Sequence, residues 1–142
     1  MILQARLSQK TAILLEHARK CQISDEALLA CVAASDISEL AAAKSEQYGY
    51  DTFITYATEH HEDLASAIRD GYRITFNTFR GLQVWLHEKF DITEGTDFDA
   101  TEGRLTGIKL SRVDAEVLEA RLAPNWVLKR NEDTIDLTVR GL

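Results

Sequence analysis

Residues 70–78, Asp-Gly-Tyr-Arg-Ile-Thr-Phe-Asn-Thr, decide the fold because the hydrophobic pattern changes within them. Before this stretch, apolar residues recur every three or four positions, which is the spacing of one face of a helix. From Tyr72 to Asn77 apolar and polar residues alternate, which is typical of a strand with one buried side. The change predicts a helical half over residues 1–71 and a sheet-containing half over residues 72–142.

The helical half contains one segment with particularly clear ends. Asp51 opens a run in which apolar residues share a helical face, and Gly71 is a residue type that commonly ends helices. The pattern predicts one continuous helix between them. Further upstream, Ser24 followed by two acidic residues predicts another helix start, since a serine side chain caps the free N–H groups and acids favour the first turn.

The second half is predicted to follow the order β-α-β-α-β-β. Thr78 begins a helix that runs to Phe90, a polar loop covers residues 91–105, and a short strand covers residues 107–110. Ser111 begins a helix that stops at Pro124. Residues 126–130 and 134–140 then flank a turn and predict a C-terminal hairpin. The expected fold class is α+β, with two helices on one face of a small mixed four-stranded sheet.

Length and composition limit the possible classes of protein. A chain of 142 residues that is 45% hydrophobic and 27% charged, with one proline, predicts a single folded domain over residues 1–142. The net charge of −7 means that binding to nucleic acid would need a local basic patch. Cys21 and Cys31 have neither the number nor the spacing of a disulfide framework or a zinc site. No apolar run is long enough to span a membrane, so a cytoplasmic location without membrane partners is expected.

A basic surface is predicted on the open face of the sheet. If Tyr72, Ile74 and the other apolar strand residues face the helices, the opposite face carries four basic residues and one acidic residue. The candidate binding residues on that face are Arg73, Asn77, Lys109, Lys129 and Arg140. They could bind RNA phosphates or an acidic protein, although the face lacks the aromatic residues that stack on single-stranded bases. The alternative is an ordinary solvated sheet face.

The densest cluster of possible metal ligands is Glu59-His60-His61-Glu62-Asp63. His60 and Asp63 are three residues apart and would share a helix face. Adjacent histidines point about 100° apart on a helix and cannot both reach one ion without help. His60 also falls on the apolar stripe, which favours a core or interface histidine over a metal or catalytic site at His60, His61 and Asp63.

Other recognisable chemistry is scarce in the sequence. Residues 97–108 match the first positions of a calcium loop, but Ile108 stands where the bidentate glutamate is required. No phosphate-binding loop, dinucleotide fingerprint or nucleophile elbow occurs, and no cofactor is predicted. A solvated loop is therefore the expected role of the acidic segment.

The predicted function is a non-enzymatic protein-interaction or regulatory module that can self-associate, for example as a homodimer. Its contact surface would be the N-terminal helices or the open sheet face. Two alternatives remain: a nucleic-acid or polyanion binder using the basic sheet face, and an enzyme or metal protein centred on His60 and His61.

Overall fold

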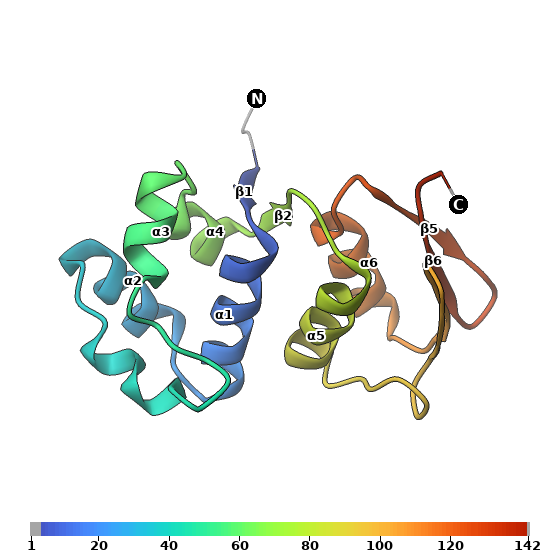
Figure 1. Cartoon of the computed structure of the whole chain (residues 1–142), viewed down its shortest axis with the longest axis horizontal. Coiled ribbons are helices and arrows are strands. Elements are labelled where there is room, and N and C mark those ends of the chain that lie inside the picture. Colours follow the sequence, from blue (N-terminus) through green and yellow to red (C-terminus); the bar gives the residue numbers. More distant parts are fainter. Residues whose placement is uncertain (1–3, 142) are drawn as a thin grey trace.

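The computed structural model describes residues 4–141 and shows a mixed helical and β-sheet protein (Figure 1). The first half contains β1 (Ala5–Leu7), α1 (Gln9–Lys20), α2 (Asp25–Ala34), the 3-10 helix η1 (Ser38–Ala43), α3 (Phe53–Glu59) and α4 (Leu64–Asp70). The second half contains β2 (Tyr72–Ile74), α5 (Phe79–Phe90), β3 (Asp99–Thr101), β4 (Arg104–Ile108), α6 (Arg112–Arg121), β5 (Trp126–Arg130) and β6 (Ile135–Val139). The predicted α+β class is confirmed.

Most helices begin where a short polar side chain can cap them. Ser24, Thr78 and Ser111 accept hydrogen bonds from the backbone N–H groups of Ala27, Gly81 and Asp114, respectively. These are the three cap positions that the sequence predicts, and each satisfies an N–H group that the helix itself leaves free.

The predicted helix from Asp51 to Gly71 is wrong because it is divided into α3 and α4. His60 ends α3, and His61 has a positive φ of 57°, which turns the chain out of the helix. Asp63 then starts α4 by accepting a hydrogen bond from Ser66 N. The break allows Glu62 to reach Ser8, whose backbone N–H donates to the Glu62 carboxylate at the start of α1.

The expected strand from Tyr72 to Asn77 is shorter than predicted and belongs to another sheet. Only Tyr72–Ile74 forms a strand, and it pairs in parallel with β1, so that Ala5 lies opposite Tyr72. Phe76 is 59% exposed and Asn77 is buried, the reverse of the predicted alternation. The segment from Asn77 is instead fixed by side-chain hydrogen bonds to Gln9 and Asn125.

The four-stranded sheet exists, but it is antiparallel and has the strand order β3-β4-β6-β5. It is therefore not the mixed sheet that was predicted. The place assigned to the Tyr72 strand is taken by β3, which lies inside the segment predicted to be a polar loop. The C-terminal hairpin of β5 and β6 is confirmed, with Leu128 opposite Leu137.

The elements form successive layers in Figure 1, with the N-terminal helices on one side, α5 and α6 in the middle and the four-stranded sheet on the other side. Helix α1 packs along α5, and buried residues of both halves belong to one hydrophobic cluster. Trp85 and Leu86 of α5 are fully buried in it. The N-terminal helices therefore cover α5 and leave the outer face of the sheet open. No helix within residues 4–141 is long and apolar enough to cross a membrane.

A buried polar network crosses the contact between α1 and α5. Glu16 is 2% exposed, and its carboxylate accepts bonds from Arg19 Nη1 at 3.2 Å, Lys89 Nζ at 3.3 Å and the Tyr72 hydroxyl. Trp85 Nε1 donates to the same hydroxyl oxygen at 3.0 Å. Burial, and then the Glu16 charge, raises the pKa of Tyr72 well above its usual value. Because every buried polar group finds a partner here, a carboxylate is tolerated inside the core.

Candidate functional site

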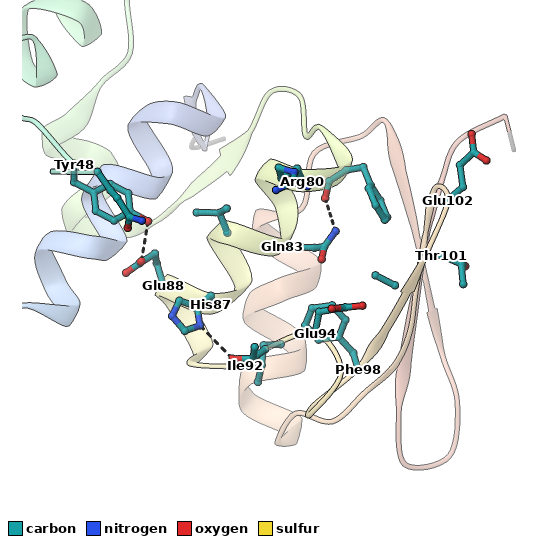
Figure 2. Close-up of a pocket in the computed structure, with 15 residues that line it drawn as sticks. Tyr48, Arg80, Gln83, His87, Glu88, Ile92, Glu94, Phe98, Thr101 and Glu102 are labelled. Atoms are coloured by element: carbon teal, nitrogen blue, oxygen red, sulfur yellow. Dashed lines mark hydrogen bonds between the residues drawn. The ribbon is translucent and has the colours of Figure 1, made fainter. Parts of the chain in front are cut away.

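A cleft of about 650 Å³ lies between α5 and β3. We call it the α5–β3 cleft. Figure 2 shows Arg80, Gln83 and His87 along the helix, with Thr101 and Glu102 across the gap at the edge of the sheet. The loop that joins α5 to β3 closes the lower end through Ile92 and Phe98. Its volume falls in the range of pockets that bind small molecules or short peptide segments.

Apolar and polar side chains both line the cleft. Ile92 and Phe98 are buried, Phe79 is 37% exposed, and Val84 and Ala100 are partly covered. The charged side chains that line it are Glu88, Glu94, Glu102 and Arg80. Three acids against one base make the cleft more acidic than basic, and it therefore favours a ligand that combines apolar groups with positive charge.

The inner end of the cleft is held by Glu88, Tyr48 and His17. The Tyr48 hydroxyl donates to Glu88 Oε1 at 2.9 Å, and His17 Nδ1 lies 3.0 Å from Glu88 Oε2. The His17 and Tyr48 rings stack with their centroids 4.0 Å apart. Burial, followed by the hydrogen bond and the charge of Glu88, raises the pKa of Tyr48 to about 12. Both carboxylate oxygens of Glu88 are thus engaged inside the protein.

The structure does not assemble the predicted histidine cluster into a metal site. The His60 ring stacks on Tyr56 and its Nδ1 donates to the Tyr56 carbonyl at 2.8 Å, while the side chains of both His60 and His61 are exposed. The Asp63 carboxylate caps α4, which lowers its pKa through the bond from Ser66 N. Within residues 4–141, no three His, Cys, Asp or Glu side chains gather as metal ligands would.

The predicted basic face is divided between two parts of the molecule. Arg73 lies on β2, outside the four-stranded sheet, and its Nη1 donates to the Leu122 carbonyl at 2.8 Å. Asn77 is 1% exposed, its Oδ1 accepts from Ala123 N, and its Nδ2 donates to Gln9 Oε1. Placing these two residues on the open sheet face was wrong, and Asn77 has a structural role.

The other three predicted binding residues do lie at the four-stranded sheet. Lys109 and Lys129 are exposed, and Arg140 follows β6 and donates from Nε to the Pro124 carbonyl. Lys129 lies directly across the ladder from Asp136, which reduces the positive charge of the face. Arg104 of β4 is a further exposed base that the sequence prediction assigned to a loop. Their part in binding a polyanion stays a prediction.

The residues of the α5–β3 cleft were missed because they come from three distant segments. Tyr48, the stretch from Phe79 to Glu88 and the stretch from Ile92 to Glu102 have no motif in common. One signal was present in the sequence: a loop of this length inside a compact domain is unusual unless it has a binding role or contains hidden structure. Here it contains β3.

No protein-family model, curated protein or solved structure matches the chain.

Proposed function

We propose that the protein is a non-enzymatic interaction module that binds an extended segment of a partner protein in the α5–β3 cleft. The observation that carries the proposal is an edge strand, β3, facing a helix across a cleft whose lining includes apolar side chains. This arrangement suits strand addition, in which a peptide extends a sheet and places alternate side chains in neighbouring pockets.

The backbone of β3 offers hydrogen bonds to such a segment at Ala100. Thr101 and Arg104 close a two-residue turn between β3 and β4. Hydrogen-bonded and non-bonded pairs alternate in an antiparallel ladder, so the N–H and C=O of Ala100, opposite Leu105, point away from β4. The next outward carbonyl, that of Phe98, already accepts from Gly95 N at 2.7 Å. The free part of the edge is therefore short, and we expect weak, transient binding.

The charge of the cleft defines the chemistry of the partner segment. Glu94 and Glu102 are exposed at the rim of the cleft, and Asp99 is exposed on β3. A segment with one or two apolar side chains for the interior, flanked by lysine or arginine, complements this surface. Since Glu88 is already bound by Tyr48 and His17, it contributes shape and charge to the cleft.

The proposed protein is cytoplasmic and can self-associate. Cys21 and Cys31 are unpaired thiols, which fits the reducing conditions of the cytoplasm. A basic segment of a second copy would also fit the cleft and produce a homodimer, whereas β3 of that copy would not, because Asp99 and Glu102 repeat the acidic charge of the rim. Light scattering over a concentration series distinguishes a homodimer from a module that binds a different protein.

The test is selection of peptides from a random display library on the full chain, followed by affinity measurement with variants. We expect the selected peptides to alternate apolar and basic residues. Ala100→Pro removes the outward N–H and should weaken binding roughly tenfold, because proline is tolerated at a sheet edge but cannot donate. Ala100→Ser keeps that N–H and is the matched control. Reversing the rim charge with Glu94→Lys and Glu102→Lys should also weaken binding.

Two results would contradict this proposal. One is unchanged peptide affinity in Ala100→Pro, measured on protein whose circular dichroism and melting temperature match the wild type. The other is selection of acidic peptides or of no peptides at all.

A further inference from the structure

A second pocket, of about 430 Å³, lies where the two halves of the protein meet. We call it the junction pocket. Four basic side chains line it, each from a different helix: Arg19 of α1, Arg69 of α4, Lys89 of α5 and Arg121 of α6. In Figure 1, α4 and β2 lie at this join between the N-terminal helices and α6. No residue is shared with the α5–β3 cleft, so the pocket is a separate feature.

The pocket is locally positive on an acidic chain. The pocket is also lined by two carboxylates, Asp25 and Asp70, and the buried Glu16 lies behind them. Four positive and three negative charges leave one positive charge, although the whole chain carries −7. The carboxylates of the chain neutralise the four bases only in part, and the remaining positive charge favours a small anion.

Two of the four bases are already committed to the protein. Arg19 forms ion pairs with Glu16 and with Asp25, at 3.2 Å and 3.0 Å. Lys89 pairs with Glu16 at 3.3 Å. These two side chains are held in fixed positions and remain about a quarter exposed. They can therefore add attraction to an anion without having to be ordered first.

The other two bases are available to a ligand. Within residues 4–141, neither Arg69 nor Arg121 forms an ion pair with a carboxylate. The Arg121 guanidinium lies 5.3 Å from the centre of the Tyr72 ring, which orients its planar group. It also lies against Gly71, where an added Cβ would overlap the Arg121 guanidinium. The glycine thus makes room for the guanidinium at the wall of the pocket.

We propose that the junction pocket binds a small phosphate monoester. Arginine guanidinium groups bind phosphate through paired N–H donors, and a dianion with several oxygens can contact cations from different helices at once. The lining is mostly polar and the volume exceeds that of a phosphate ion, so the remainder of the ligand is small and polar. Such a ligand would bridge α4 and α6 and hold the two halves together.

Thermal denaturation of the full chain, with added glycerol 3-phosphate or inorganic phosphate at constant ionic strength, tests this proposal. Saturable stabilisation is expected from both compounds, since ligands that bind the folded state raise its stability by mass action. A larger effect of glycerol 3-phosphate supports a monoester as the ligand, and an equal or smaller effect would contradict it in favour of inorganic phosphate. Binding should strengthen between about pH 5 and 7.5, because the second ionisation of a monoester falls near pH 6.

Variants locate the site. Arg121→Gln and Arg69→Gln should each weaken phosphate binding roughly tenfold, because each removes a charge-assisted contact. Arg121→Lys should give an intermediate loss, because it keeps the charge and loses the paired donors. Arg112→Gln is the matched control, since Arg112 is an exposed arginine of the same helix and lies outside the pocket. For each variant, the melting temperature with phosphate is compared with its own melting temperature without phosphate. A change in the stability of the unbound variant therefore does not affect the comparison.

No stabilisation of the wild type at millimolar phosphate would overturn the proposal. So would an equal shift with sodium chloride alone at the same ionic strength, or a phosphate-induced shift that is equal in Arg112→Gln, Arg69→Gln and Arg121→Gln.

Discussion

Polar side chains are buried on one side of α5 and exposed on the other. Toward α1, the carboxylates of Glu16 and Glu88 are enclosed and every oxygen has a partner. Toward the sheet, Arg80, Glu94 and Glu102 line the cleft and their side chains are exposed. One helix therefore supports stability on one side and offers a binding surface on the other. Substitutions on the α1 side should therefore change the free energy of unfolding, and substitutions on the cleft side should change the affinity for a peptide.

The largest expected effect comes from removing the centre of the enclosed network. Glu16→Ala leaves Arg19, Lys89 and the Tyr72 hydroxyl without their shared acceptor. We expect a loss of about 4 kcal/mol in the free energy of unfolding, because breaking a buried ion pair leaves its partners uncompensated. Urea denaturation measures this loss. Glu94→Ala, at the exposed rim, should change stability by less than about 0.5 kcal/mol, and equal effects of the two substitutions would contradict the contrast.

A smaller loss is expected at Asn77, which sequence reasoning placed on a binding face. Asn77→Ala removes the acceptor of the buried Ala123 N–H and the donor to Gln9. The expected cost is about 2 kcal/mol, the penalty for an unsatisfied buried polar group plus a lost hydrogen bond. The same denaturation experiment on Lys129→Ala should show almost no change, because Lys129 is exposed on the open sheet. A stable Asn77→Ala variant would contradict the structural role of Asn77.

The smallest of the three effects is expected at Tyr48, where the two sides of α5 meet. Tyr48→Phe should cost about 1.5 kcal/mol, as is usual for a hydrogen bond to a charged group. The pKa of Tyr48 is raised from 10 to about 12, so the hydroxyl contributes its full stability below pH 10 and loses it as the pH rises through 12. Alkaline unfolding monitored with tyrosine absorbance measures this. Identical alkaline unfolding of Tyr48→Phe and the wild type would show that Tyr48 does not cause the pH dependence.

Local signals in the sequence predicted much of the fold. Ser24, Thr78 and Ser111 cap helices because the capping interaction involves residues only three apart. The hairpin of β5 and β6 was also predictable, since its strands alternate and a polar turn separates them. In each case the residues that determine the structure are neighbours in the chain.

Interactions between distant residues explain the errors. The helix expected through His60 and His61 is broken where Glu62 bonds to Ser8, 54 residues away. The alternation from Tyr72 predicted a strand but not its partner, because nothing in a single sequence marks Ala5–Leu7 as the segment that pairs with it. Both candidate pockets combine residues from several elements, so neither has a sequence motif.

The parallel pair of β1 and β2 also has a consequence for synthesis of the chain. Ala5 leaves the ribosome 67 residues before Tyr72, its partner, so β1 has nothing to pair with for roughly 3 to 13 s at typical translation rates. The N-terminal helices can form during that interval, but their packing cannot be completed until β2 and then α5 have emerged. Co-translational folding should therefore advance in one late step, and a nascent chain halted before that point would be the form most exposed to proteases and chaperones.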